Sequence, residues 1–585
     1  MLVARARLHY PRLQRNRMFV ARATLHCSRL LIILLVFAST RPATGRPHTA
    51  PRSGLRFEVS FPSHVRNTPV DGRVFVMISN TQDPEPRLQT RDYKGCTPFF
   101  GLNVDGLAPD KPAVVDDAAY GYPLEHLHDL PAGDYYVQAM LSVYTVFHRS
   151  DGHVVKLHMD QWEGQQFQTS PGNLYSDVQK LHLDPAAGGE IRIEMNTILP
   201  AVKPPTDTDY VKHVKFKSEL LSSFWGQPIY IGATVLLPKD YDVNKGIKYP
   251  VNYEQGHFST DPPGHFRGVS SPGPVTGEEA AGGAQPQEFS KAWLGDKYPR
   301  MLYVTFQHPC PYYDDSYAVD SPNVGPYGQA ITRELIPYIE SHFRAISKPY
   351  ARILSGGSTG GWEALALQIF YPDYFGGAFA YCPDPVDFHF FQALNIYDWP
   401  NAWYRKEGWV QVPIPGDRNI DGIVLSTMKQ QLNYERARGD RGRSGEQWDI
   451  WQAVFGPVAA DGYFKPLIDP DTGAIDKEVA AYWRDHMDLT QYLKSHWSQI
   501  GQTLSGKIHV WVGDMDTYYL NDAVHLMEQT LNTTTNPPCG CSVVYGPRKP
   551  HCWAGPFTLA ERIKQMAEYV AERSPRDEDL SWWRF

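Results

Sequence analysis

Ser358 lies in the stretch LSGGSTGGW, where Gly356, Ser358 and Gly360 form the pattern G-x-S-x-G. The preceding run ARILSG is apolar and short enough for a buried strand, and the following TGGWEALALQIF suits a helix. A serine on a sharp strand-to-helix turn projects its hydroxyl above the sheet edge, and the glycines give the turn room. The pattern therefore predicts a nucleophile. The alternative is a glycine-rich turn with an ordinary capping serine.

A serine hydroxyl needs a base at neutral pH, and the sequence offers one far downstream. Asp516 follows the expected strand Ile508–Val512, and His551 follows the expected strand Ser542–Tyr545. In this architecture the order along the chain is Ser, acid, His, with the histidine taking the serine proton and the carboxylate orienting the ring. We predict Ser358, Asp516 and His551 as catalytic residues.

Other residues compete for these roles. Asp514 leaves the same strand as Asp516, which we favour because it lies further out on the loop. Asp384, after the strand that follows the nucleophile helix, is the alternative acid. His551 has its own alternative as a capping or core residue, and three other histidines also fall near expected strand ends: His257, His308 and His389.

Backbone amides are expected to stabilise the oxyanion. The expected strand Tyr249–Tyr253 leads into a loop in which Gly256 allows close approach of the backbone to a substrate. The amide of His257 or Phe258 would pair with that of Thr359 at the helix N-terminus, where free N–H groups and the helix dipole favour negative charge.

Cofactor and metal motifs are weak. The stretch DRNIDG at 417–422 begins like a calcium loop, but position twelve is Met428 where a bidentate Glu belongs. The pairs at 539–541 (CGC) and 551–552 (HC) suggest zinc, but a disulfide is favoured in an exported chain and zinc would consume the proposed base. We find neither a P-loop nor a GxGxxG after a strand, and expect no cofactor and no metal.

The elements that must position these residues alternate between strand and helix from residue 211 to 573. This pattern predicts an α/β domain with a mostly parallel sheet covered on both faces. The expected strands are Tyr230–Leu237, Tyr249–Tyr253, Met301–Gln307, Ala351–Ser355, Gly377–Tyr381, Ile508–Val512 and Ser542–Tyr545. The expected helices are Tyr327–Phe343, Thr359–Phe370, Asn521–Leu531 and Leu559–Glu572.

Residues 55–200 have a different texture, with short apolar stretches separated by turn clusters. They predict an N-terminal β-rich domain resembling a sandwich, with a structural or substrate-positioning role. Residues 199–209 contain three prolines and few apolar groups, which is typical of a linker.

The N-terminus is expected to be a targeting signal. Residues 1–45 hold eight arginines and no acid, with the apolar run LLIILLVFA and then small residues. We predict a signal peptide over 1–45 and a secreted or periplasmic protein. An Arg-rich transit peptide is the alternative, and Met18 is an alternative start. Export permits disulfides among the six cysteines that remain, in any of fifteen pairings.

Composition excludes several classes. The chain has 585 residues, 42% hydrophobic and 21% charged, which is ordinary for a globular protein. The nine-residue apolar run is too short to span a bilayer, so we expect no stable membrane insertion. The net charge is -8 even with the N-terminal arginines, which gives no attraction for nucleic acid.

Four segments carry a resemblance: TVLLPKDYDVNKGIKYPVNYEQG, LSGGSTGGWEAL, VGDMDTYYLNDAVHLMEQTL and PHCW. Over about 230–382 and 505–572 the chain resembles the Putative esterase (esterase D-like) family of α/β-hydrolases, which includes enterochelin, feruloyl and acetylxylan esterases and S-formylglutathione hydrolases. The informative matches are Leu237, Pro238, Tyr241, Gly513 and Asp516. The resemblance implies Ser358 as nucleophile, Asp516 as acid and His551 as base.

The chain departs from this family in two places. Gln255-Gly256-His257 replaces the usual His-Gly, and 158 residues separate Ser358 from Asp516. The excess, roughly 385–505, is an aromatic-rich insertion expected to cover the site; the alternative is that its aromatics pack its own core. It contains Trp399, Trp403, Tyr404, Trp409, Trp448, Trp451, Tyr463, Phe464, Tyr482, Trp483 and Trp497.

These expectations combine into one functional hypothesis. We predict a secreted serine esterase that hydrolyses a small-molecule or polysaccharide-linked carboxylic ester through an acyl-enzyme. The alternatives are a catalytically inactive relative that binds a ligand and a serine peptidase on the same fold.

Overall fold

The computed structural model describes residues 54–268 and 286–583, all within the compact unit Pro51–Phe585. The predicted signal peptide, 1–45, lies outside these residues. In the described ranges, no helix combines the length and the apolar character that crossing a bilayer requires.

An eight-stranded sheet organises the C-terminal part of the described chain, in the order β13-β14-β16-β15-β19-β20-β25-β26. The first two pairings are antiparallel and the five from β16 to β26 are parallel. Strands β15, β19 and β20 are almost wholly buried, as expected when helices cover both faces. The strands are β13 (Val211–Ser218), β14 (Ile229–Leu236), β15 (Val251–Gln255), β16 (Leu302–Gln307), β19 (Arg352–Gly357), β20 (Gly377–Tyr381), β25 (Ile508–Gly513) and β26 (Ser542–Gly546).

Helices pack on this sheet, which confirms the predicted α/β class. The central helix α6 (Thr359–Phe370) contacts β15, β19 and β20, and all its residues but the last are buried. The predicted helix 327–343 contains a π-helical turn at Ile331–Leu335, because Pro337 has no N–H for the carbonyl of Arg333. The others are α1 (Glu219–Trp225), α3 (Pro286–Trp293), α4 (Tyr327–Ala330), α5 (Ile336–His342), α10 (Leu489–Leu504), α11 (Leu520–Asn532) and α12 (Leu559–Arg573).

Residues 54–200 form strands, as their alternating patterns predict. A three-stranded sheet has the order β11-β1-β4, and a second sheet has the path β12-β9-β6-β2-β3-β5, with β10 paired to β6. One apolar core lies under both. The strands are β1 (Leu55–Ser60), β2 (Val70–Ser79), β3 (Phe99–Leu107), β4 (Ala113–Val115), β5 (Tyr120–Tyr122), β6 (Gly133–Val143), β9 (Leu174–Tyr175), β10 (Gln179–Leu183), β11 (Gly189–Glu194) and β12 (Thr197–Ile198).

The hairpin of β7 (Thr145–His148) and β8 (Val154–Leu157) joins this region to the large sheet. Its apolar side chains belong to the same core cluster as those of β14 and β16. The N-terminal strands and the large sheet therefore share buried apolar surface, in addition to the covalent link.

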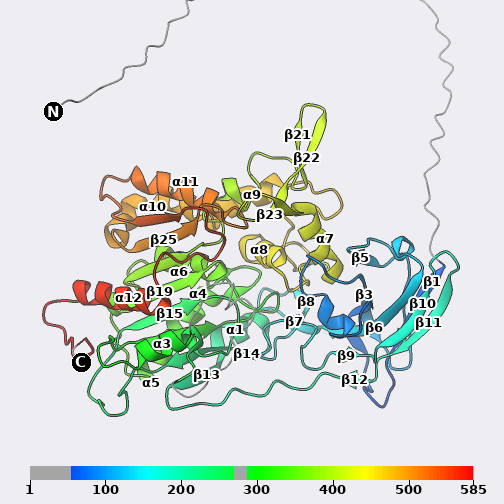
Figure 1. The fold of residues 1–585 in the computed structure, drawn as a ribbon, viewed down its shortest axis with the longest axis horizontal. Coiled ribbons are helices and arrows are strands. Elements are labelled where there is room, and N and C mark those ends of the chain that lie inside the picture. The colour runs from blue at the N-terminus through cyan, green and yellow to red at the C-terminus, as the bar shows by residue number, and fades with distance from the viewer. Residues whose placement is uncertain (1–53, 269–285, 584–585) are drawn as a thin grey trace, which may run out of the picture. The chain divides into compact units, whose positions relative to one another are not determined.

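The insertion contributes helices and short hairpins. Figure 1 shows α7 beside β3 and β5 of the N-terminal region, and these elements are in contact. Buried arginines connect the two: Arg73 donates to the carbonyl of Ala437 at 2.9 Å, and Arg438 donates to that of Thr90 at 3.1 Å. The elements are β21 (Tyr404–Glu407), β22 (Val410–Pro413), β23 (Pro415–Arg418), β24 (Val424–Thr427), α7 (Met428–Arg438), α8 (Gln447–Phe455) and α9 (Lys477–His486), and a further short hairpin before α4 pairs β17 (Asp320–Ser321) with β18 (Gly325–Pro326).

Candidate active site

Ser358 occupies the sharp turn between β19 and α6. Its backbone has φ 56° and ψ -123°, a conformation that non-glycine residues rarely adopt. A Cβ on Gly356 would lie 2.3 Å from the carbonyl oxygen of Gly360, and a Cβ on Gly360 would lie 2.1 Å from that of Gln255. The two glycines are therefore needed for the turn and for the close approach of the β15 loop.

His551 and Asp516 lie beside this serine. The loop after β25 carries Asp516 and the loop after β26 carries His551. Ser358 Oγ lies 2.9 Å from His551 Nε2, and His551 Nδ1 lies 2.8 Å from Asp516 Oδ2. Nδ1 faces a carboxylate and so carries the ring proton, which leaves the Nε2 lone pair facing the serine hydroxyl. The structure thus brings together three residues that the sequence pattern predicts as catalytic and that come from segments far apart.

The surroundings of His551 favour its protonated form. Burial lowers the pKa of the imidazole, but the negative charges of Asp516 and Cys552 and the hydrogen bonds to them outweigh burial, so the pKa lies well above its usual value. Tyr518 contacts the ring edge-on, with 5.0 Å between ring centroids. The His551 ring is therefore held in place by a carboxylate on one side and an aromatic ring on another.

Asp384, the alternative acid, contacts Ser358 instead of His551. Ser358 Oγ lies 3.4 Å from Asp384 Oδ1, while Oδ2 accepts hydrogen bonds from Tyr317 at 2.5 Å and from the Thr359 hydroxyl at 3.1 Å. Burial raises the pKa of this carboxyl. Asp516 is the carboxylate that bonds His551, so the geometry supports it over Asp384 as the orienting acid.

The predicted oxyanion loop lies against the start of α6. The short Cβ distance at Gly360 places the backbone of Gln255 and Gly256 directly beside the helix N-terminus. The His257 side chain turns to Asp314, 3.1 Å away, and lines the pocket that contains Ser358. The Phe258 ring packs edge-on against Trp162. The donor role of the Thr359, His257 and Phe258 amides stays a prediction.

A pocket of about 760 Å³ opens above Ser358 and His551. The insertion supplies one wall, including Trp448 and Trp451, so part of the aromatic set does line the site. Other members, such as Trp483, are buried in the core. Besides the predicted catalytic residues, the residues that line the pocket include Arg91, Asp92, Tyr93, Lys94, Tyr313, Gln392, Gln431, Tyr434, Glu435, Glu446, Gln447, Trp448, Trp451, Tyr518 and Leu520.

The wall at residues 91–94 was not found from the sequence. This loop belongs to the N-terminal β-rich region and reaches the pocket through the insertion: Lys94 Nζ lies 2.7 Å from Asp417 Oδ2 and the Tyr93 hydroxyl donates to the same oxygen at 3.0 Å. Asp417 also accepts from Ser426 at 2.6 Å. Asp417 therefore serves as a buried anchor for the loop, and it is the first residue of the segment 417–422 that begins like a calcium loop.

Two groups of side chains in the described residues have donor atoms close enough for a metal ion. In the first, Cys382, His551 and Cys552, the Nδ1 proton of the histidine faces Asp516 and its Nε2 lone pair faces the Ser358 hydroxyl, so both ring nitrogens already have partners. In the second, His257 Nδ1 lies 3.1 Å from Asp314 and 3.3 Å from Asp315, and these carboxylates raise the pKa of His257 well above its usual value. This ring nitrogen therefore faces the two carboxylates as a hydrogen-bond donor.

Comparisons with known proteins agree with the predicted resemblance. A family model described as "Putative esterase" matches residues 306–457. This confirms the resemblance to that family and supports a carboxylic ester hydrolase. No curated protein matches the chain.

Several solved structures are similar to the chain. One is a ferulic acid esterase, with 18% identity, a TM-score of 0.34 and coverage of 62% of this chain and 98% of that chain. An S-formylglutathione hydrolase from Agrobacterium tumefaciens has 14% identity, a TM-score of 0.33 and coverage of 62% and 98%. A fluorophosphonate-binding serine hydrolase from Staphylococcus aureus has 12% identity, a TM-score of 0.33 and coverage of 62% and 97%.

Proposed function

We propose that this chain is a serine esterase in which Ser358 is the nucleophile, His551 the general base and Asp516 the orienting acid. The observation that carries the proposal is the pair of contacts at His551, 2.9 Å to Ser358 Oγ and 2.8 Å to Asp516 Oδ2. The match of residues 306–457 to an esterase family supports the same reaction class.

The chemistry follows from these contacts. His551 Nε2 removes the proton as Ser358 Oγ attacks the ester carbonyl, and the Asp516 carboxylate stabilises the imidazolium. The backbone amide of Thr359, with that of His257 or Phe258, stabilises the tetrahedral oxyanion. His551 then gives its proton to the leaving alcohol, which leaves an acyl-enzyme. Water, activated by the same histidine, hydrolyses it.

The size and the polar lining of the pocket support an ester that carries a large polar group. About 760 Å³ is within the range of small-molecule sites. Aromatic rings with amide and carboxylate groups between them suit a planar acyl group or a sugar face, so we propose a small-molecule or polysaccharide-linked ester. We also propose that residues 1–45 direct export, and that the N-terminal region is a β-sandwich module whose loop 91–94 helps to bind the substrate.

A fluorophosphonate probe tests the reaction. It should label the wild-type protein and fail to label Ser358→Ala, while Ser355→Ala, a buried serine in β19, serves as the matched control and should be labelled. Equal labelling of Ser358→Ala would overturn the assignment. An absence of labelling in the wild type would favour an inactive binding protein. A panel of p-nitrophenyl esters and peptides then separates an esterase from a serine peptidase.

A further inference from the structure

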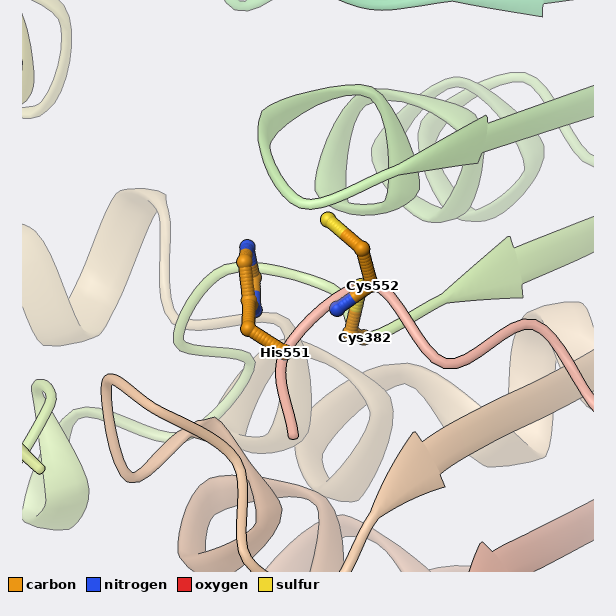
Figure 2. A group of neighbouring side chains, drawn as sticks. All are labelled: Cys382, His551 and Cys552. Atoms are coloured by element: carbon orange, nitrogen blue, oxygen red, sulfur yellow. The ribbon is translucent and has the colours of Figure 1, made fainter. Parts of the chain in front are cut away.

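Two cysteines adjoin the histidine without having a part in the proposed chemistry. Cys382 follows β20, and Cys552 follows His551 in the loop after β26, so the side chains come from two neighbouring loops (Figure 2). The N–H of Cys552 donates to Cys382 Sγ at 3.0 Å, and the sulfurs and the His551 ring lie within 4.8 Å of one another. Both cysteines are free thiols in the structure.

The two thiols differ in access and in charge. Cys552 is exposed and lines the pocket beside Ser358, whereas Cys382 is buried. The hydrogen bond from Cys382 lowers the pKa of the Cys552 thiol to about 4, and His551 acts in the same direction. Burial raises the pKa of Cys382. An accessible thiolate next to a buried thiol is the arrangement of an attacking and a resolving cysteine.

We propose that Cys382 and Cys552 are a redox pair that forms a disulfide by exchange with a small disulfide of the glutathione class. The Cys552 thiolate attacks one sulfur of the small disulfide, forming a mixed disulfide and releasing a thiolate. Cys382 then attacks Cys552 Sγ, and the second small thiol leaves with the Cys382 proton. Two protein thiols are oxidised and one small disulfide is reduced to two thiols.

The position of the bond indicates its effect. The Ser358 N–H donates to the carbonyl of Tyr381 at 2.9 Å, and the Asp384 N–H donates to the carbonyl of Ser358 at 3.1 Å. Cys382 therefore sits between two residues that bond to the backbone of the nucleophile. A disulfide from Cys382 to Cys552 fastens the histidine loop to this segment and cross-links residues 170 apart in sequence, which restricts the unfolded chain.

Peptide mapping tests the bond without relying on catalysis, so its failure is distinct from failure of the esterase proposal. Trypsin releases Cys382 in the peptide 353–405 and Cys552 in 549–562, each as the single cysteine, while Cys539 and Cys541 share the peptide 508–548. After incubation with glutathione disulfide and alkylation, we expect a cross-linked species of 353–405 with 549–562 that dithiothreitol splits. Full alkylation of both cysteines under these conditions would overturn the proposal.

Thermal unfolding provides a second test. We expect dithiothreitol to lower the Tm of the oxidised wild type by about 3–4 °C more than that of Cys382→Ser/Cys552→Ser. The double variant retains Cys539 and Cys541, whose sulfurs are bonded in the structure, so the difference isolates the proposed bond. Equal shifts would contradict it. Stoichiometric zinc that protects both thiols from alkylation would likewise overturn the redox pair, in favour of metal ligands.

Discussion

Replacing Asp516 with Asn tests the proposed triad sharply, because the structure fixes which way the new amide must face. Asp516 Oδ1 accepts backbone N–H groups from Tyr518 at 2.9 Å and Leu520 at 3.3 Å, and Oδ2 faces His551 Nδ1 at 2.8 Å. In Asp516→Asn the amide oxygen must stay with the two backbone donors. Its NH2 group then donates to His551 Nδ1, which forces the ring proton onto Nε2. A protonated Nε2 cannot accept the proton of Ser358.

The expected loss follows from this tautomer change. A triad histidine held in the wrong tautomer lowers kcat by about 10⁴, which is about 5 kcal/mol of transition-state stabilisation. The side chains have the same shape and the site is buried, so the fold should survive. We would measure kcat and KM on p-nitrophenyl acetate and the melting curve by circular dichroism. A folded Asp516→Asn with kcat within tenfold of wild type would refute the assignment.

Asp384→Asn is the matched control. Asp384 is also a buried carboxyl at the site, but it contacts Ser358 at 3.4 Å and leaves the proton position on His551 unchanged. We expect a loss in kcat of about tenfold or less, because Ser358 loses one long hydrogen bond while the new amide oxygen can still accept from Tyr317 and Thr359. The opposite ranking, with Asp384→Asn far more damaging than Asp516→Asn, would make Asp384 the acid.

Two further predictions concern the base and the turn. Because the pKa of His551 is raised, kcat/KM under reducing conditions should fall with decreasing pH through a pKa above 6.5, since only the neutral ring accepts a proton. Cys552→Ser removes a negative charge beside the ring and should move this fall in kcat/KM to lower pH. A pH profile of kcat/KM measures both effects. Gly360→Ala should lower the free energy of unfolding by about 1–3 kcal/mol in urea and reduce kcat, because its Cβ would meet the Gln255 carbonyl. A Cβ on Gly357 would lie 3.8 Å from the Tyr381 carbonyl oxygen, an ordinary contact, so Gly357→Ala should change the free energy of unfolding little. Equal effects of the two substitutions would argue against the packing explanation.

The sequence predicts the elements next to Ser358 well, because local pattern and tertiary burial agree there. The predicted helix 359–370 and strand 377–381 have the observed bounds. The apolar residues of these two segments show no second periodicity that would predict a different element. Strand β13, in contrast, is absent from the prediction. Its sequence VKHVKFKS places lysines along an edge strand, where their side chains can reach solvent, and these charges mask the alternation of apolar and polar residues.

The residues of the candidate site also fall into two groups, those that local patterns locate and those that only tertiary packing brings to the site. The order Ser, acid, His depends only on strand ends, which sequence patterns locate, and the structure brings Ser358, Asp516 and His551 into contact. The contact of Cys552 with Cys382 depends on how two loops cross 170 residues apart, which no local pattern encodes. Sequence reasoning therefore finds residues at strand ends more readily than those that reach the site through loop packing.

In the proposed esterase, the residues that select the substrate lie outside the sheet that carries Ser358, Asp516 and His551. Loops at the ends of its strands carry these three residues, but the volume above Ser358 is bounded by the loop 91–94 from the N-terminal region and by α7 and α8 from the insertion. Lys94 reaches the fully buried carboxylate of Asp417, and an unpaired buried charge is costly, so the loop and the insertion hold each other in place. A change in either segment alters both walls together, while the geometry of the reacting groups depends on the strands beneath.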